Sequence, residues 1–245
     1  MLVEDVLKQR RVTPLTAHEK RALESAIAEV RDHGPREILV RQGQPCHESI
    51  LLLDGLISRH VDGRDGSRQL VAIQVPGDFV DLHGFPLKML DHDVGTVTPC
   101  RIALVPHARL DPLVEAMPAL ARKLWFLTLI DAAIHRAWML RIGRLKAIAR
   151  VAHLLCEINL RLRVVGLSDG RQFPLPMTQT DIGEICSLTA IHVNRVLREL
   201  RDSGLCTFRN ARVDIHDLPA LARLGAFEPH YLYLQPQATA GMAGA

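Results

Sequence analysis

The 245-residue sequence predicts an α+β fold: an N-terminal antiparallel β-roll (a jelly roll), a long helix and a C-terminal winged helix-turn-helix domain. Three observations predict it. Short β-rich runs separated by glycine turns fill the first half. Apolar residues then recur every seven positions, and two capped helices joined by a tight turn lie near the end. The expected boundaries are 15–110 for the β-roll, 112–142 for the long helix, 143–224 for the winged domain and 225–245 for a disordered tail.

Composition is ordinary for a globular protein, with 48% hydrophobic and 23% charged residues. No run approaches the ~18 apolar residues that span a membrane, and the N-terminus lacks the apolar core of a signal peptide. We therefore expect a cytoplasmic protein with no membrane partner. The five cysteines are scattered without a CxxC pair, which favours buried, reduced thiols. A net charge of +3 permits nucleic-acid binding without indicating it.

The β-roll is preceded by an amphipathic helix predicted over 15–30, in which Thr16 and Glu19 form a capping box. From residue 37 to 106 the pattern changes to short β-rich runs, at 38–40, 50–53, 56–61, 69–75 and 101–105. Glycine-containing turns separate them, which is typical of antiparallel strands. The connection 77–95 is longer than a hairpin needs, and long connections in compact β domains often bind a ligand.

The helix predicted over 112–142 carries two interleaved rows of apolar residues, as in a two-stranded coiled coil. The rows consist of Leu113, Leu120, Leu127 and Ile134, and of Met117, Leu124 and Trp138. We expect these residues to form a homodimer interface, with burial of the helix inside its own chain as the alternative. Asp131 falls on the second row, where it either specifies register or marks a bend. Gly143 interrupts the helical run and is the expected hinge.

Residues 178–205 have the layout of a helix-turn-helix motif. Thr178 and Asp181 are placed to cap the first helix, and Thr189 is placed to cap the second, over 189–203, which Gly204 ends. The second helix has an inward stripe of Val193, Val196, Leu197 and Leu200 and an opposite face with Ile191, Asn194, Arg195 and Arg198. A hairpin follows, turning at Asn210-Ala211. Such a motif presents its second helix to the major groove of DNA.

The elements, in this order, resemble the Crp-Fnr family of bacterial transcription regulators. The strongest match is MTQTDIGEICSLTAIHVNRVLRELRDSGL at 177–205, supported by ILLLDGLIS at 50–58, VPGDFVDL at 75–82 and WMLRIGRLKAIARVAHLL at 138–155. The resemblance runs from about residue 15 to 217. It implies a homodimer that binds a pseudo-palindromic site in double-stranded DNA, contacts RNA polymerase, and responds to a signal at a cyclic-nucleotide-binding-like domain.

The resemblance places the near-universal arginine of the family's recognition helix at Arg195. Its guanidinium can donate two hydrogen bonds to guanine; a phosphate contact or a solvated side chain are the alternatives. Better-known members carry an Arg-Glu pair where this chain has Ala190 and Ile191. Ile191 either packs on a thymine methyl group or contacts the wing. Further candidate DNA contacts are Thr178, Gln179, Thr189, Ala190, His192, Asn194, Arg198, Arg209 and Arg212.

The effector motifs of two branches of the family are missing. Cyclic-nucleotide-binding members hold the phosphate with a Gly-Glu pair and a downstream arginine, whereas this chain has GDFVDLHGF and no arginine between Arg68 and Arg101. Oxygen-sensing members carry an N-terminal cysteine cluster for an iron–sulfur centre, and here no cysteine precedes residue 45. Haem or a metal remains an alternative on account of His47, His60, His83, His92 and His107, although no pair has ligand spacing. The cofactor is therefore unknown and no metal ligand is assigned.

Two other classes of function fit less well. A regulatory module that binds a protein partner would not need an arginine-bearing outer face on 191–198. An enzyme would need a catalytic constellation, and the sequence has no Gly-rich phosphate loop, nucleophile elbow or HExxH motif. The sequence therefore predicts a sequence-specific DNA-binding transcription regulator, controlled by an unidentified signal at the β-roll.

Overall fold

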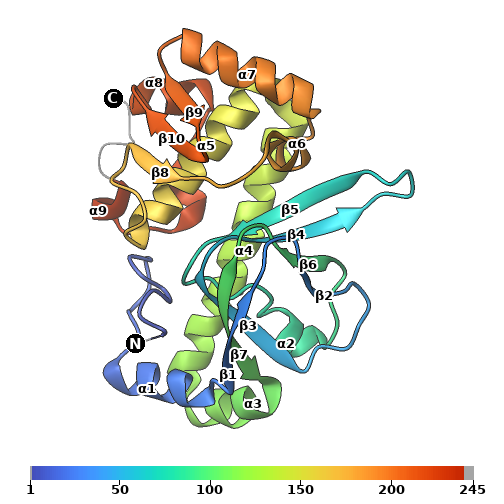
Figure 1. The fold of residues 1–245 in the computed structure, drawn as a ribbon. Coiled ribbons are helices and arrows are strands. Elements are labelled where there is room, and N and C mark those ends of the chain that lie inside the picture. Colours follow the sequence, from blue (N-terminus) through green and yellow to red (C-terminus); the bar gives the residue numbers. More distant parts are fainter. Residues whose placement is uncertain (1, 240–245) are drawn as a thin grey trace. The chain divides into compact units, whose positions relative to one another are not determined.

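The computed structural model describes residues 2–239 (Figure 1). The chain divides into two compact units, with the boundary between Ala132 and Ala133. The N-terminal unit contains α1 (Ala17–Ala26), β1 (Glu29–His33), β2 (Ile38–Val40), β3 (Glu48–Asp54), β4 (Ile57–Asp62), β5 (Arg68–Gln74), α2 (Gly84–Leu87), β6 (Asp93–Thr96), β7 (Cys100–Pro106) and α3 (His107–Ala116). Helix α4 (Pro118–Arg144) begins in this unit and ends in the next.

The C-terminal unit continues with α5 (Ala147–Val164), β8 (Gln172–Pro174), α6 (Gln179–Cys186), α7 (Ala190–Asp202), β9 (Cys206–Arg209), β10 (Arg212–Ile215) and α8 (Leu218–Leu224). A 3₁₀ helix, η1 (Pro229–Leu232), and a short helix, α9 (Pro236–Thr239), complete it. The predicted α+β class, with antiparallel strands first and a winged helix-turn-helix last, is confirmed. Among the described residues, no helix combines the length and apolar character needed to cross a membrane.

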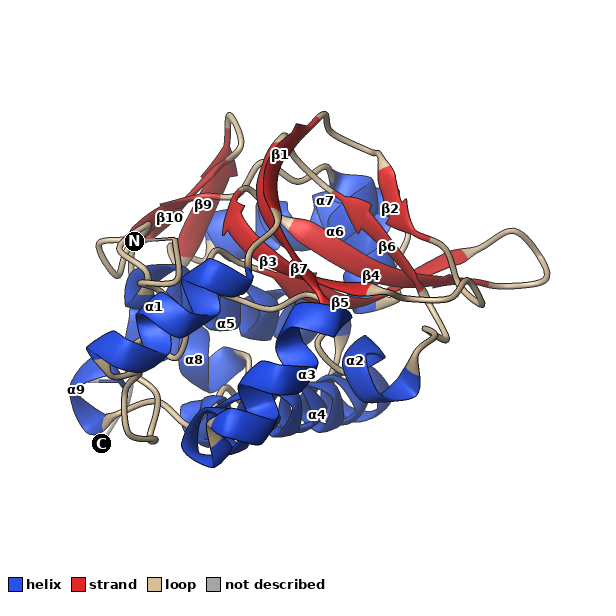
Figure 2. Ribbon diagram, turned by 90° about the horizontal axis from the view of Figure 1, so that it is seen from below, coloured by secondary structure: helices blue, strands red, loops and turns tan. Residues whose placement is uncertain are grey.

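The β-roll consists of two antiparallel sheets, ordered β1-β7-β3 and β2-β6-β4-β5 (Figure 2). Strands β3 and β7 are buried on both faces. Alternate side chains point to opposite faces of a strand, so Ile50 and Leu52 join a core cluster with residues of the second sheet, while Leu51 joins another with helices α3 and α4. Burial on both faces explains why these runs are continuously apolar.

The first helix is shorter than predicted. Its Thr16–Glu19 capping box forms as expected, but α1 ends at Ala26, and Ile27 has extended backbone. Residues 29–33, partly assigned to the helix by their pattern, form β1 and pair with β7. Strand β1 is largely exposed, so it lacks the apolar run that marks a strand in sequence. The long connection 77–95 also holds secondary structure, namely α2 and the start of β6.

The long helix is interrupted where the sequence predicts continuity. Met117 leaves the helical conformation (φ −129°, ψ 73°), and Pro118 starts α4, as suits a residue that lacks an N–H. At the other end, Gly143 lies inside α4 and is not the break. The break falls at Leu145 and Lys146, where the extended backbone of Lys146 caps α5. The interruption of the helix therefore begins two residues after Gly143, where the sequence pattern placed it.

The predicted dimer seam lies largely within the chain, contrary to expectation. Leu120 and Leu124 are buried in the core of the N-terminal unit, with Leu113, Met117 and Leu127 packed against the same core. Ile134 and Trp138 are also buried. A seven-residue apolar repeat reports that one helix face is covered, but not which partner covers it. Here the chain's own β-roll covers the first part of that face.

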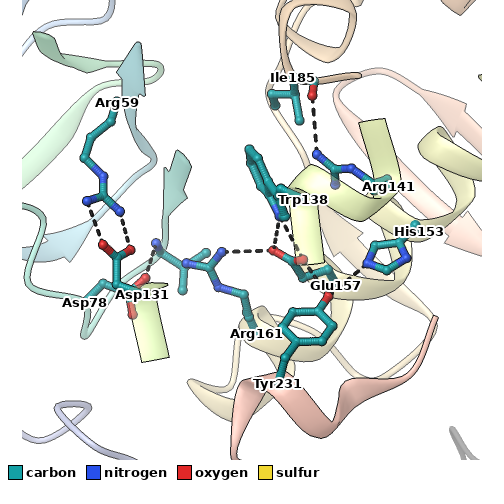
Figure 3. Close-up of polar contacts among 11 residues, drawn as sticks. Arg59, Asp78, Asp131, Trp138, Arg141, His153, Glu157, Arg161, Ile185 and Tyr231 are labelled. Carbon is teal, nitrogen blue, oxygen red and sulfur yellow. Dashed lines mark hydrogen bonds and ion pairs between the residues drawn. The ribbon is translucent and has the colours of Figure 1, made fainter. Parts of the chain in front are cut away.

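Asp131, the polar residue on the predicted seam, has a partner inside the N-terminal unit. Its carboxylate accepts two hydrogen bonds from the guanidinium of Arg59 on β4, one of them 2.8 Å long (Figure 3). The Arg59 side chain is only 2% exposed. The pair therefore neutralises a buried charge and links the sheet to α4, which removes the need for a role in dimer register.

Residues 225–239 are packed against α5, contrary to the disorder expected for 225–245. Phe227, Leu232, Leu234 and Ala238 are buried, and α9 contacts α5. The segment has no regular apolar repeat, so its few spaced apolar side chains do not stand out in the sequence. Residues 240–245, the rest of the predicted tail, lie outside the described residues.

Deleting residues 227–245 should destabilise the C-terminal unit by ~3 kcal/mol or more, because burying one large apolar side chain stabilises by about 1.5–3 kcal/mol. Differential scanning calorimetry of the full-length and shortened chains measures this effect. Superimposable unfolding transitions would show that the segment makes no stabilising contact.

Candidate nucleic-acid interface

Helices α6 and α7 form the predicted helix-turn-helix. The Thr178 hydroxyl accepts a hydrogen bond from the Asp181 amide at 3.1 Å, and the Asp181 carboxylate accepts one from the Thr178 amide at 2.6 Å. The two residues thus form the capping box that the sequence predicts. Ser187 in the turn has φ 53°, and the Leu188 amide donates to the Gly183 carbonyl at 2.9 Å. These contacts fix where α7 begins.

Gly183 makes this turn possible, a role that the sequence pattern alone did not reveal. A Cβ atom at this position would lie 2.4 Å from the carbonyl oxygen of Leu188. That contact is with backbone and cannot be relieved by a side-chain rotation. The glycine itself could have indicated this role. A glycine inside a helical segment costs about 1 kcal/mol of helix stability relative to alanine, and it often marks a point where another backbone segment comes close.

Helix α7 has two chemically opposite faces. Val193, Val196 and Leu200 are at most 2% exposed, and the helix contacts α5, α6 and β9 (Figure 1). The other face is in contact with solvent and carries Ile191, Asn194, Arg195 and Arg198. Ile191 is 86% exposed, more than any other large hydrophobic side chain in the described structure. The face pattern predicted from sequence is confirmed, and the wing does not cover Ile191.

Polar contacts order the first turn of this exposed face. The Thr189 hydroxyl accepts a hydrogen bond from the His192 amide at 3.2 Å, which caps α7. One turn on, His192 Nε2 lies 2.9 Å from Arg195 Nη2. Ala190, at the first helical position, is half-buried. This contact joins two side chains on consecutive turns of the solvent-exposed surface of α7.

The remaining candidate contacts lie around α7. Gln179 is half-buried at the start of α6, where backbone N–H groups are free of intrahelical partners. The wing hairpin turns at Asn210 and Ala211, both with positive φ, as the predicted two-residue turn requires. Arg209 is exposed beside this turn. Arg212 Nη2 donates to Gln172 Oε1 at 3.0 Å, so this arginine braces β10 against β8.

Two arginines outside the motif hold the end of α6. Arg141 Nη2 donates to the Ile185 carbonyl at 3.3 Å, and Arg150 Nη1 donates to the Cys186 carbonyl at 3.2 Å. The last carbonyls of a helix have no intrahelical partner and attract cations. Arg150 Nε also donates to the Leu145 carbonyl at 2.8 Å, so it spans the α4–α5 junction as well. Sequence spacing does not reveal such contacts, because the partners are far apart in the chain.

The C-terminal unit also contains a fully buried carboxylate, that of Glu157 on α5 (Figure 3). It accepts hydrogen bonds from Trp138 Nε1 at 3.0 Å, Tyr231 OH at 2.6 Å and Arg161 Nη1 at 3.3 Å. Burial alone would raise the pKa of Glu157, but the charges of Arg161 and Arg141 and the Tyr231 hydroxyl lower it. The carboxylate is therefore ionised and joins α4, α5 and the C-terminal segment.

The histidines and cysteines of the β-roll form no recognisable ligand set. The rings of His83 and His92 lie 5.3 Å apart, and His107 contacts the Ser49 hydroxyl at 3.2 Å. Between residues 2 and 239, no group of three or more His, Cys, Asp or Glu side chains is arranged to hold a metal ion. All five cysteines are free and buried, as predicted. Burial raises the pKa of Cys186 to about 11, so this thiol is protonated.

Comparison with family models matches both units. A model of the Crp-like helix-turn-helix domain matches residues 149–224. A model of the cyclic nucleotide-binding domain matches residues 30–117. The two segments together cover about two thirds of the chain.

Individual proteins are similar over most of their length. The transcriptional activator protein anr of Pseudomonas aeruginosa is 26% identical over 210 residues, 86% of each chain. The nitrogen fixation regulation protein FixK of Bradyrhizobium diazoefficiens is 29% identical over 177 residues, covering 71% of this chain and 73% of FixK. The structure of FixK2 from Bradyrhizobium japonicum superposes with a TM-score of 0.75 at 25% identity, covering 82% of this chain and 99% of FixK2.

Replacing Gly183 with alanine should destabilise the helix-turn-helix by about 1–3 kcal/mol, because the new Cβ forces the turn apart. Gly143→Ala is the matched control. Nothing lies within 4 Å of a Cβ at that position, so alanine should be neutral or stabilise α4 by up to about 1 kcal/mol. Urea denaturation of the variants measures both effects, and equal stabilities would refute the assigned role of Gly183.

Proposed function

The chain belongs to the Crp-Fnr family of DNA-binding transcription regulators, and on this premise we propose that it binds a pseudo-palindromic DNA site as a homodimer through α7. The observation that carries the proposal is the contrast between the two faces of α7. One face is buried against its own domain, while the other exposes Arg195, Asn194 and Arg198. A helix of this kind fits the major groove.

Arg195 is the residue we assign to base recognition. An arginine guanidinium donates two hydrogen bonds to guanine O6 and N7, a pairing worth about 1–3 kcal/mol of discrimination. The exposure of Arg195 and its contact with His192 on the same surface of α7 support this role. Arg198 and Arg209 are assigned to the DNA backbone, together with the helix N-termini near Gln179 and Ala190.

We assign the dimer interface to the face of α4 that lies opposite the seam predicted from the sequence. Four large apolar side chains there are 51–72% exposed: Trp125, Leu129, Met139 and Leu140. With Ala132 and Arg136, the positions 125, 129, 132, 136 and 139 keep the alternating four- and three-residue spacing of a coiled-coil seam, with Arg136 as its one charged member. Exposed apolar stripes of this extent mark interaction surfaces. A parallel pair of α4 helices would set two α7 helices about one turn of DNA apart, ~34 Å.

We assign reception of the regulatory signal to the N-terminal unit. Helix α4 is the natural transmitter because it begins in that unit, is tied to β4 by the Arg59–Asp131 pair, and ends in the C-terminal unit. The effector is unidentified. The relative from Pseudomonas aeruginosa is named a transcriptional activator, which supports activation of transcription as the regulatory outcome. Contact with RNA polymerase is part of the same proposal.

Arg195→Ala should reduce affinity for the selected DNA site about tenfold or more, because two hydrogen bonds to a base are lost. Affinity for random duplex DNA should change little. Fluorescence anisotropy at fixed salt compares the two, using a site recovered by in vitro selection. Arg223→Ala, which removes an exposed arginine from α8, is the control for the lost charge. Equal losses on both duplexes would exclude base recognition by Arg195.

Leu129→Lys should weaken the dimer without unfolding the chain, because it places a charge in the exposed stripe of α4. Ala119→Lys is the matched control, since this residue is exposed on the same helix but off the stripe. Sedimentation velocity at micromolar concentration, combined with circular dichroism, measures assembly and folding together. Unchanged dimerisation of the Leu129 variant would reject this interface.

A further inference from the structure

We infer that Ile191 recognises thymine, by packing against its 5-methyl group in the major groove. This inference rests on the proposed function, because it concerns the same DNA-binding face. The sequence left two explanations for an apolar residue here: contact with the wing or contact with DNA. At 86% exposure the side chain has no substantial contact within the chain, so the wing does not account for it.

The surroundings of Ile191 favour DNA over a protein partner. Protein-binding patches are contiguous and apolar, whereas the other exposed side chains on this face of α7, those of Asn194, Arg195 and Arg198, are polar or charged. Such neighbours suit a surface that meets phosphates and base edges. A single apolar side chain among them provides a local contact and not a hydrophobic docking site.

The chemistry of the groove then identifies the base. Each base pair presents hydrogen-bond donors and acceptors in the major groove, and among the unmodified bases only thymine adds an apolar group there, its methyl at C5. Isoleucine can neither donate nor accept a hydrogen bond. Over cytosine it would displace water from the N4 amino group without replacing the hydrogen bond, which is unfavourable. Contact with Ile191 therefore stabilises the complex at a thymine and destabilises it at a cytosine.

The position of Ile191 also predicts where this thymine lies. Ile191 and Arg195 are four residues apart on α7, so they share a face and are separated by about 6 Å along the helix axis. Stacked base pairs are about 3.4 Å apart. The thymine should therefore lie within about two base pairs of the guanine that Arg195 contacts. Ala190, the neighbouring first residue of the helix, has a short side chain that leaves room for this approach.

The test uses the full-length dimer and a duplex recovered by in vitro selection, with deoxyuridine replacing thymidine at single positions near the guanine. Deoxyuridine keeps every Watson–Crick hydrogen bond and lacks only the methyl group. When the replaced thymidine is the one that Ile191 contacts, the affinity of the wild-type chain for the duplex should fall about fourfold. This is the ratio expected for burying one methyl-sized group. The Ile191→Ala variant should bind the two duplexes with equal affinity, because the alanine side chain is too short to reach the thymine methyl group. The same replacement outside the contacted base pairs is the DNA control.

Three other outcomes would overturn the inference. If the wild-type chain prefers the selected site but is indifferent to deoxyuridine at every nearby position, Ile191 does not read thymine, while the proposed function stands. If Ile191→Ala retains the wild-type preference for thymidine over deoxyuridine, another residue contacts the methyl group. If no duplex is preferred over random DNA, the proposed function itself fails. Because alanine is a good helix former and position 191 is exposed, misfolding does not confound the comparison.

Discussion

The C-terminal unit is organised around one buried negative charge. Removing a carboxylate from water is unfavourable unless charged and hydrogen-bonding partners compensate it. Glu157 receives such compensation from Trp138 on α4, Arg161 on α5 and Tyr231 after α8. Each partner comes from a different part of the chain, so satisfying the charge requires all three segments to be in place together. The ordered C-terminal segment follows from this constraint as much as from its apolar burial.

The same region contacts the helix-turn-helix motif. The Arg141 guanidinium stacks over the Trp138 ring, 4.2 Å from its centroid, and donates to the end of α6. Arg150 makes a second contact with the end of α6 and one with the α4–α5 junction. A shift at that junction would therefore reach α6 through two charged side chains that are hydrogen-bonded to it. Packed and hydrogen-bonded networks of this kind transmit small displacements well, because they have few intermediate arrangements.

Helix α4 illustrates the limit of reading a periodic pattern. On α4, the repeat Leu120, Leu127 and Ile134 correctly indicates a covered face, but the β-roll covers its first part where a second chain was expected. The stripe that remains for a partner contains Trp125, Leu129 and Met139, with Arg136 between them. The covered stripe is the more regular of the two, because Arg136 interrupts the exposed one. The stronger pattern in the sequence was therefore the intramolecular one.

The sequence by itself determined those features that depend on neighbours along the chain. Capping boxes at Thr16 and Thr178, the turn at Asn210-Ala211 and the two faces of α7 arise from interactions over a few residues, whose geometry local backbone conformation dictates. Only the tertiary structure decided the partners of Asp131, Glu157 and Arg141, and the solvent exposure of Ile191. Those outcomes depend on contacts between segments that are far apart in sequence. They also depend on burial, which sets the free-energy cost of every unpaired charge and exists only once the chain has folded.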